Sequence, residues 1–349
     1  MIKVLVVDDS ALIRALLGKI IEDDPMLSLV GSAPDAFVAR DMVKRFQPDV
    51  ITLDIEMPKV DGLTFLERLM QAHPTPVIMI STLTSAGAEA TLRALELGAV
   101  DFIAKPKIEV SRGIESYQEL ITAKIKMAAK ARLVKPKAPV AGRVLISSQN
   151  FTSSEKLLAI GASTGGTEAI KYLLMQFPAS MPAIVITQHM PPGFTKTFAT
   201  RLDSLCKVRV KEAVQGERLL AGCAYIAPGD QHMEVIRSGS DYRVRLHQED
   251  RVSGHRPSVD VMFRSLAHSA GVNTVAVIMT GMGRDGAEGM SLLSKQGCYT
   301  FAQDEASCVV FGMPKEAIKL NAVNEVLGLE QLAEAVLKKF SSISATTRL

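Results

Sequence analysis

Short apolar runs that alternate with amphipathic stretches fill the amino-terminal third of the chain, and this pattern constrains the fold more than any other feature. The apolar runs have the length of buried strands, and the stretches between them repeat apolar residues at helical spacing. Such an alternation predicts a doubly wound α/β domain, in which helices connect the strands of one parallel sheet. The apolar runs lie at residues 4–7, 29–30, 50–53, 77–80 and 100–103, and the amphipathic stretches at 11–20, 36–46, 63–70 and 88–97.

Polar and charged side chains close four of these apolar runs. The carboxyl ends of parallel strands lie at one edge of a sheet, so these side chains are expected to gather there. Three converging carboxylates repel one another unless a cation neutralises them, which predicts a Mg²⁺ site built from Asp8, Asp9 and Asp54. The closing residues are Asp8 and Asp9 after the first run, Asp54 after the third, Ser81 after the fourth and Lys105 after the fifth.

Phosphoryl transfer is a second use of the same side chains. A carboxylate can attack a phosphoryl group to form an acyl phosphate. Lys105 would then pair with the added negative charge, and Ser81 would hydrogen-bond a phosphoryl oxygen. The alternative interpretation is that the three aspartates only cap the helices that follow the strands.

Residues 1–120 resemble a response-regulator receiver domain, which is a flavodoxin-like fold. The resemblance implies that Asp54 accepts the phosphoryl group and that Asp8 and Asp9 bind the metal ion. It also implies a cis peptide bond before Pro106, since cis bonds occur almost only before proline. The matching segments are Val7-Asp8-Asp9-Ser10, Asp54-Ile55-Glu56-Met57-Pro58 with Asp61-Gly62, Ser81, and Lys105-Pro106.

Residues 121–153 are predicted to form a linker. The stretch contains no acidic residue, and Pro136 and Pro139 prevent a helix from continuing through it. Its basic residues would also suit a nucleic-acid or membrane surface, but no aromatic residue interleaves them before Phe151. A solvated spacer that includes the end of a receiver helix is therefore favoured.

A serine flanked by glycines marks the second half of the chain. Gly161-Ala162-Ser163-Thr164-Gly165 follows the apolar run 157–160, and a serine on a sharp turn between a strand and a helix is typical of serine hydrolases. His189 and Asp285 also follow apolar runs, at residues 183–187 and 275–280. One parallel sheet could therefore bring the three side chains together at its carboxyl edge.

The three residues suit a hydrolase mechanism. His189 would remove the proton of Ser163, and Asp285 would orient the imidazole and stabilise its charged form. The backbone amides of Thr164 and Met282 are the expected donors to the developing oxyanion. The chain order Ser, His, Asp differs from that of the α/β-hydrolases, so the nucleophile turn does not predict their fold.

Other functions are weighed against the hydrolase. With 40 basic and 37 acidic residues the charge is too balanced to imply nucleic acid as the main partner, and no basic recognition helix is visible. Gly161-x-x-x-Gly165-Gly166 does not supply a dinucleotide-binding fingerprint. A phosphorylation-gated scaffold or DNA-binding regulator, with a structural Ser163, stays the alternative. No run approaches the roughly 18 apolar residues of a membrane helix, so a cytoplasmic protein without membrane insertion is expected.

Nearly the whole chain resembles the CheB family of chemotaxis response-regulator methylesterases. The resemblance implies a catalytic domain at residues 154–345, a second doubly wound parallel-sheet domain in which Ser163, His189 and Asp285 are catalytic. The matching segments are Ile160-Gly161-Ala162-Ser163-Thr164-Gly165-Gly166-Thr167-Glu168, Thr187-Gln188-His189-Met190-Pro191-Pro192-Gly193-Phe194, Tyr225-Ile226-Ala227-Pro228-Gly229-Asp230, His255-Arg256-Pro257-Ser258-Val259-Asp260, Thr280-Gly281-Met282-Gly283-Arg284-Asp285-Gly286 and Ala306-Ser307-Cys308-Val309-Val310-Phe311-Gly312-Met313-Pro314.

The same resemblance implies an activity, partners and regulation. The expected reactions are hydrolysis of glutamyl methyl esters and deamidation of glutamines on methyl-accepting chemoreceptors. A chemotaxis histidine kinase would supply the phosphoryl group to Asp54, with Mg²⁺ needed only for that step and no cofactor for the esterase step. We expect the unphosphorylated receiver to restrain the Ser163 site, and phosphorylation to release it.

The remaining histidines receive structural interpretations. His255 and Arg256 could contact substrate, but Pro257-Ser258-Val259-Asp260 is equally typical of a helix start. His232, His247 and His268 are expected at the surface or as hydrogen-bonded core residues.

Overall fold

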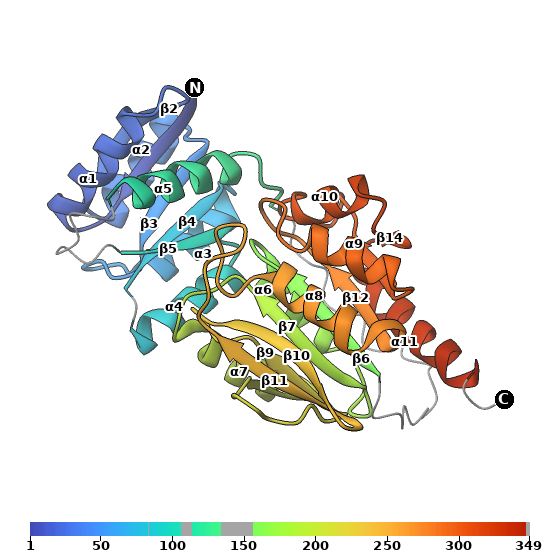
Figure 1. Ribbon diagram of the computed structural model, residues 1–349. Coiled ribbons are helices and arrows are strands. Elements are labelled where there is room, and N and C mark those ends of the chain that lie inside the picture. Colours follow the sequence, from blue (N-terminus) through green and yellow to red (C-terminus); the bar gives the residue numbers. More distant parts are fainter. Residues whose placement is uncertain (83, 106–113, 134–155, 347–349) are drawn as a thin grey trace. The chain divides into compact units, whose positions relative to one another are not determined.

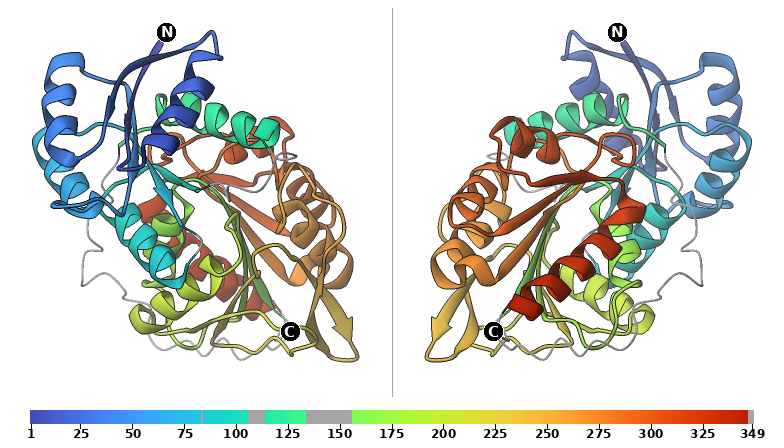
Figure 2. Two further views of the ribbon diagram at one scale, coloured as in Figure 1. Left: turned by 90° about the vertical axis from the view of Figure 1, so that its left-hand side faces the viewer. Right: turned by 90° about the vertical axis from the view of Figure 1, so that its right-hand side faces the viewer.

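The computed structural model describes residues 1–82, 84–105, 114–133 and 156–346, and the chain divides into two compact units, Met1–Lys135 and Pro136–Leu349 (Figure 1). Each unit contains its own parallel sheet, and helices cover both faces of that sheet (Figure 2). The α/β class predicted from the sequence is confirmed for both units. No helix in the described residues is both long enough and apolar enough to cross a membrane.

The first unit is a five-stranded parallel sheet with the strand order β2-β1-β3-β4-β5, which is the flavodoxin-like order. Helices α1 and α5 lie on one face and α2, α3 and α4 on the other (Figure 2). The strands are β1 (Ile2–Val7), β2 (Leu27–Ala33), β3 (Val50–Asp54), β4 (Val77–Ser81) and β5 (Asp101–Ala104), and the helices are α1 (Ala11–Glu22), α2 (Ala36–Phe46), α3 (Gly62–Ala72), α4 (Ser85–Glu96) and α5 (Ile114–Ala128).

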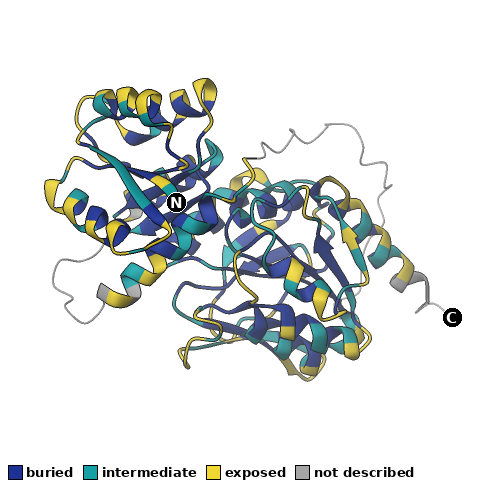
Figure 3. Ribbon diagram, turned by 90° about the horizontal axis from the view of Figure 1, so that it is seen from above, coloured by how far each residue is buried: buried dark blue, intermediate teal, exposed yellow. Residues whose placement is uncertain are grey.

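The central strands are apolar along their length because helices bury both faces of the sheet. Residues 50–54 and 77–81 are buried throughout, and Figure 3 shows buried strands between helices with exposed outer faces. A glycine brings the chain back to the end of β3, because a Cβ on Gly62 would lie 2.0 Å from the carbonyl oxygen of Asp54. The loop after β3 can therefore close tightly over the sheet edge that carries Asp54.

The end of the first unit differs from the boundary expected at residue 120. Helix α5 continues to Ala128, and the first unit extends to Lys135. The beginning of the expected linker is thus helical, since its lysines and apolar residues from 121 to 128 complete an amphipathic helix that buries Ile121 and Ile125. The rest of the expected linker beyond residue 133 lies outside the described residues, as does Pro106 with its expected cis bond.

The second unit is a seven-stranded parallel sheet with the order β14-β13-β12-β6-β7-β9-β8. Helices α6, α7 and α11 cover one face, and α8, α9 and α10 cover the other (Figure 2). The strands of this sheet are β6 (Leu157–Ala162), β7 (Ala183–Gln188), β8 (Arg209–Glu212), β9 (Cys223–Ile226), β12 (Thr274–Ile278), β13 (Tyr299–Gln303) and β14 (Glu325–Leu327), and the helices are α6 (Gly166–Leu174), α7 (Phe194–Leu205), α8 (Val259–Ser269), the 3₁₀ helix η1 (Gly271–Asn273), α9 (Ala287–Lys295), α10 (Met313–Lys319) and α11 (Leu329–Thr346).

Strand β6 is the point at which the winding of this sheet reverses. The chain first adds β7, β8 and β9 on one side of β6, and then crosses to add β12, β13 and β14 on the other. Ligands of open parallel sheets bind outside the carboxyl ends of strands at such a switch point. Ser163 directly follows β6 and so occupies that position.

A hairpin that the sequence analysis did not anticipate lies beside this sheet. Strands β10 (His232–Ser238) and β11 (Asp241–His247) pair antiparallel and form a separate two-stranded sheet. The hairpin packs on α8 through buried residues that include Met233, Val235 and Val244. It therefore packs against the helix whose beginning borders the Ser163 site and shares a buried core with that helix and the main sheet.

Helix α8 reaches the main sheet because two glycines leave space for Val259, its first residue. A Cβ on Gly161 would lie 2.2 Å from Val259 Cγ1, and a Cβ on Gly286 would lie 2.6 Å from the same atom. Gly286 also has a φ of +89°, which a residue with a side chain rarely adopts. These two positions therefore determine how closely α8 approaches strand β6.

We expect Gly161→Ala to destabilise the second unit by about 1–3 kcal/mol, because the added methyl group must displace Val259 or the backbone of α8. Denaturant unfolding of the second unit measures the effect. Gly328→Ala is the matched control, since a Cβ at Gly328 meets no atom closer than 3.5 Å. Equal stability of the two variants would contradict the packing argument.

Candidate functional site

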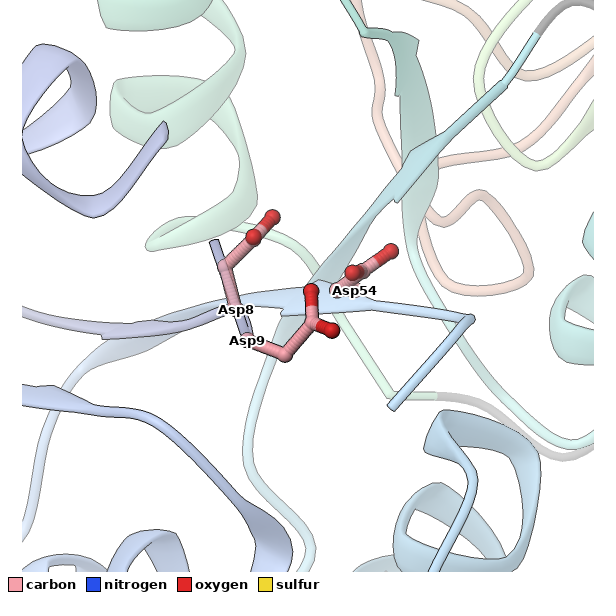
Figure 4. A group of neighbouring side chains, drawn as sticks. All are labelled: Asp8, Asp9 and Asp54. Carbon is pink, nitrogen blue, oxygen red and sulfur yellow. The ribbon is translucent and has the colours of Figure 1, made fainter. Parts of the chain in front are cut away.

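The carboxyl edge of the first sheet brings acidic side chains from two strands together. Asp54 is the last residue of β3, and Asp8 and Asp9 directly follow β1. One carboxylate oxygen from each of the three aspartates lies within 4.8 Å of the others (Figure 4). Asp8 and Asp54 are buried, whereas Asp9 is exposed. The three carboxylates are thus close enough to share a cation.

Lys105 supplies one positive charge to this cluster. Its Nζ donates a hydrogen bond to Asp54 Oδ2 at 2.7 Å and lies 3.3 Å from Asp8 Oδ2. Burial nevertheless raises the pKa of Asp54 to about 6, and the neighbouring charge of Asp8 contributes in the same direction. Burial also raises the pKa of Asp8. The negative charge is therefore incompletely compensated, and carboxylate oxygens are the ligands that a hard divalent cation prefers.

Ser81 lies at the same edge with its hydroxyl directed toward the backbone. Its Oγ lies 3.3 Å from the carbonyl oxygens of Thr82 and Gly87, to which it donates. The hydroxyl proton would have to leave these carbonyl oxygens before it could be donated to a phosphoryl oxygen on Asp54. The role of Ser81 in phosphoryl binding stays a prediction.

Three adjacent strands of the second sheet position Ser163, His189 and Asp285. Ser163 follows β6, His189 follows β7, and Asp285 lies in the loop between β12 and α9. Backbone hydrogen bonds continue past the strand ends, because the His189 amide donates to the Ala162 carbonyl at 3.2 Å and the Ser163 amide donates to the Thr280 carbonyl at 3.0 Å. The turn after Ser163 is tight, since Gly165 has a φ of +77° and a Cβ there would meet Val309.

His189 and Asp285 form a direct contact. His189 Nε2 lies 2.7 Å from Asp285 Oδ2, and both side chains are almost fully buried. The other ring nitrogen, Nδ1, is buried and has no hydrogen-bond partner among the described residues. Nδ1 is therefore the ring nitrogen that the contact with Asp285 leaves unengaged. Contacts between a nucleophile and its base are often formed only when substrate is bound.

Asp285 is held as an anion by an unusually complete set of donors. Burial alone would raise its pKa, but the hydrogen bond and charge of His189 together with bonds from Ser258 and Val259 lower the pKa of Asp285 to about 2. Ser258 Oγ donates to Oδ1 at 2.7 Å, the Val259 amide to Oδ2 at 2.7 Å, and the Asp260 amide to Oδ1 at 3.1 Å. These groups begin helix α8, whose positive end favours a carboxylate.

Gln188 joins the turns that carry Ser163 and His189. Its Nε2 donates to the Ser163 carbonyl at 2.9 Å and to the His189 carbonyl at 3.2 Å. Gly166 makes room for this side chain, since a Cβ at Gly166 would lie 2.2 Å from Gln188 Oε1. Sequence reasoning missed this residue. A buried glutamine at the end of an apolar strand is the signal that could have indicated it.

His255 stacks on the imidazole of His189. The ring centroids are 3.6 Å apart, and the planes differ by 10°. Arg256 instead binds the loop around it, because it forms an ion pair with Asp230 and donates to the carbonyl oxygens of Gln248 and Glu249. The structure thus places His255 against the candidate base and gives Arg256 a local structural role.

The loop that contains Met282 has a backbone amide available for an oxyanion. The Gly281 carbonyl accepts hydrogen bonds from the amides of Gly312 and Met313, which orients the peptide unit between residues 281 and 282. In a trans peptide the N–H points opposite to the C=O, so the Met282 amide points away from those two donors. That amide has no acceptor in the described part of the chain. A Cβ on Gly281 would lie 2.7 Å from Ser163 Cβ, so this loop adjoins the nucleophile.

Thr164, the other expected oxyanion donor, is buried directly after Ser163. Its carbonyl accepts a hydrogen bond from Thr280 Oγ1 at 2.9 Å, which ties the nucleophile turn to the end of β12. This contact orients the peptide unit that follows Thr164. Its own amide as an oxyanion donor stays a prediction.

The three remaining histidines of the second unit lie outside the contact between His189 and Asp285. His232 is fully buried and hydrogen-bonded, His268 is exposed and lies 2.7 Å from the Arg264 carbonyl, and His247 lies between Glu234 and Glu249 at 3.7 Å from each. The hydrogen-bonded core position expected for His232 connects indirectly to the site, because its Nδ1 accepts the Ser258 amide.

Asp54→Asn should stabilise the metal-free protein by about 2 kcal/mol at pH 7, because it removes a buried charge whose folded-state pKa is raised from 3.8 to about 6. The folded state binds more protons than the unfolded state between these values. The wild-type protein therefore loses stability as the pH rises through this window, and the advantage of Asp54→Asn disappears below about pH 4.

Urea unfolding at pH 4 and pH 7 in a chelator measures this difference for the first unit. Asp41→Asn is the control, because Asp41 forms only an exposed ion pair with Arg40. Equal stability of wild type and Asp54→Asn at pH 7 would show that burial does not raise the pKa of Asp54.

Two family models match the chain. The CheB methylesterase model matches residues 158–336, and the response regulator receiver domain model matches residues 4–114. The catalytic domain of Thermotoga maritima CheB methylesterase, a solved structure, is 38% identical with a TM-score of 0.52, and covers 53% of this chain and 99% of its own.

Full-length relatives carry one name, protein-glutamate methylesterase/protein-glutamine glutaminase. The Shewanella oneidensis protein, whose name ends in the number 2, is 61% identical to this chain over 98% of this chain and 99% of its own length. The corresponding Pseudomonas aeruginosa protein is 58% identical over 100% and 99%, and the Salmonella typhimurium protein is 54% identical over 98% and 97%. These matches confirm the family indicated by the motifs. The chain belongs to the CheB methylesterase family, with a response regulator receiver domain ahead of its methylesterase domain.

Proposed function

We propose that this chain hydrolyses glutamyl methyl esters and deamidates glutamine side chains on chemoreceptors, and that phosphorylation of Asp54 increases the rate. The observation that carries the esterase proposal is the contact between His189 Nε2 and Asp285 Oδ2, which leaves the buried Nδ1 as the base beside the Ser163 turn. The names of the full-length relatives support the choice of substrate. A cytoplasmic location belongs to the same proposal.

The proposed reaction begins when Ser163 Oγ attacks the ester carbonyl carbon and His189 Nδ1 takes the hydroxyl proton. The carbonyl oxygen becomes an oxyanion, to which the amides of Met282 and Thr164 donate. Asp285 stabilises the imidazolium through Nε2, and its low pKa keeps it ionised during this step.

The intermediate collapses when the bond between the carbonyl carbon and the methoxy oxygen breaks. His189 gives its proton to the leaving oxygen, which departs as methanol and leaves an acyl group on Ser163. Water then attacks the carbonyl carbon of this acyl-enzyme while His189 accepts one of its protons. The bond between that carbon and Ser163 Oγ breaks, His189 returns the proton to Oγ, and the product acid ionises to a glutamate carboxylate. A glutamine side chain follows the same course and releases ammonia in place of methanol.

Methanol release from methylated chemoreceptor membranes tests the esterase proposal. Ser163→Ala should abolish release, and Asp285→Asn should lower kcat by roughly 10³–10⁴-fold, because a neutral amide neither fixes the imidazole tautomer nor stabilises the imidazolium. Ser265→Ala, which removes a hydroxyl from the same unit outside these contacts, is the control and should retain activity. Release that persists in folded Ser163→Ala would contradict the assignment of the nucleophile.

The receiver part of the proposal rests on the cluster at the edge of the first sheet. Asp8, Asp9 and Asp54 would hold a Mg²⁺ ion, which neutralises negative charge when it is bound. An Asp54 carboxylate oxygen would attack the phosphorus of a phosphohistidine on a histidine kinase, the P–N bond would break and leave the imidazole of the kinase, and Asp54 would become an acyl phosphate. Lys105 would pair with the added charge, and Ser81 would donate a hydrogen bond to a phosphoryl oxygen.

A small phosphodonor should therefore stimulate methanol release by wild type and leave Asp54→Asn at its basal rate.

Mg²⁺ binding has a readout that is independent of activity. Millimolar Mg²⁺ should raise the melting temperature of the first unit in wild type, since a ligand stabilises the state that binds it. Asp9→Asn should remove most of this shift in melting temperature, because it removes one of the three carboxylates. Asp9 is exposed, so the substitution should disturb packing little. Asp41→Asn should keep the shift. An unchanged melting temperature of wild type at saturating Mg²⁺ would exclude the metal site.

A further inference from the structure

The Asp285 carboxylate receives hydrogen bonds from two sides. His189 Nε2 approaches Oδ2 from the sheet, whereas Ser258 and the first amides of α8 approach from the opposite side. Ser258 is the cap that precedes α8, and its hydroxyl is the side-chain donor from this end of the helix. It lies 2.7 Å from Oδ1. The oxygen that does not face His189 is thus held by the Ser258 hydroxyl at 2.7 Å and by the Asp260 amide at 3.1 Å.

Every polar group of Ser258 has a partner. Its hydroxyl has one hydrogen, which it donates in the hydrogen bond to the Asp285 carboxylate. The same oxygen accepts a hydrogen bond from the Val261 amide at 3.4 Å and so caps α8. Its backbone amide donates to His232 Nδ1 at 3.2 Å. Ser258 is fully buried, so water does not compete for these bonds.

His232 holds Ser258 from the beginning of strand β10. Its Nδ1 accepts a hydrogen bond from the Ser258 amide, which requires that Nδ1 carry a lone pair and no proton. The ring proton is therefore on Nε2, which donates to the Asp250 carbonyl at 3.0 Å. His232 is fully buried, and burial lowers its pKa, which favours this neutral form. A chain of contacts therefore runs from the β10 hairpin through Ser258 to the carboxylate.

We propose that Ser258, held by His232, is a positioning residue that orients the Asp285 carboxylate toward His189. The inference rests on the proposed esterase function and extends it, because it explains which carboxylate oxygen faces the imidazole. A carboxylate can rotate about its bond to Cβ, and a fixed donor to Oδ1 restricts that rotation. Among the described residues Ser258 has no hydrogen bond to Ser163 or His189, so we assign its effect to the contact with Asp285.

Loss of the hydroxyl should therefore affect the rate of chemistry more than substrate binding. Ser258→Ala is expected to lower kcat for methanol release by about 10–100-fold with little change in KM, because small errors in the position of a catalytic group reduce the rate steeply. Ser258→Thr retains the hydroxyl and should recover most of the activity. Ser265→Ala is the control and should leave kcat unchanged. It removes a hydroxyl of α8 that accepts a hydrogen bond from the Val235 amide of β10.

Proton NMR of the full chain gives a readout that does not depend on turnover. The proton between His189 Nε2 and Asp285 Oδ2 should give a low-field resonance, identified by its loss in Asp285→Asn. That resonance should shift or broaden in Ser258→Ala and stay in place in Ser258→Thr and Ser265→Ala. Circular dichroism and thermal unfolding establish that each variant is folded. If Ser258→Ala does not fold, Ser258→Cys replaces it with a weak donor of similar shape and the same expected result.

The outcomes separate this inference from the proposed function. An unchanged kcat and an unchanged resonance in folded Ser258→Ala would overturn the positioning role while leaving the esterase intact. Equal losses in Ser258→Ala and folded Ser258→Thr would also overturn it, because the hydroxyl would then not be the determinant. If wild type releases no methanol, the proposed function fails, and the NMR comparison still decides whether Ser258 orients Asp285.

Discussion

The site of the second unit depends on the hydrogen bonds between the buried Asp285 carboxylate and the groups at the beginning of helix α8. A buried anion is tolerated only when hydrogen bonds replace the water that it has lost. Here the donors come from the helix end and from His189, so the carboxylate joins α8 to the imidazole after β7. The glycines at 161 and 286 let Val259 approach the sheet, and this approach brings the helix end within reach of Asp285.

The two units use buried carboxylates in opposite electrostatic states. In the first unit burial and mutual repulsion raise the pKa of Asp54 to about 6, because Lys105 compensates only part of the charge. In the second unit Asp285 has four hydrogen-bond donors, and its pKa falls to about 2. The first arrangement leaves negative charge that Lys105 does not fully compensate, whereas the second holds a permanent negative charge beside the imidazole of His189. Both sites lie at carboxyl ends of parallel strands, where the backbone leaves space for ligands.

Sequence reasoning was strongest where a residue directly follows an apolar run. Asp8, Asp54, Ser163 and His189 were placed at strand ends in this way, and the structure has strands that end before or at each of them. It was weaker where local composition is ambiguous. The β10–β11 hairpin was not expected, whereas the end of a receiver helix expected in the linker is present as the last turns of α5. Gln188 was also missed, because its role depends on contacts with two backbone carbonyls outside its own strand.

By itself the sequence determined the alternation of strands and helices, the family, and the residues that could carry the chemistry, because these depend on local patterns of apolar, polar and glycine residues. Only the tertiary structure decided which nitrogen of His189 faces Asp285 and which groups hold the carboxylate. The motif at 255–260 indicated a helix start, and in the structure Ser258 is the N-terminal cap of that helix. That the same hydroxyl also binds Asp285, 27 residues later in the chain, depends on the packing of α8 against β6, which no local pattern encodes.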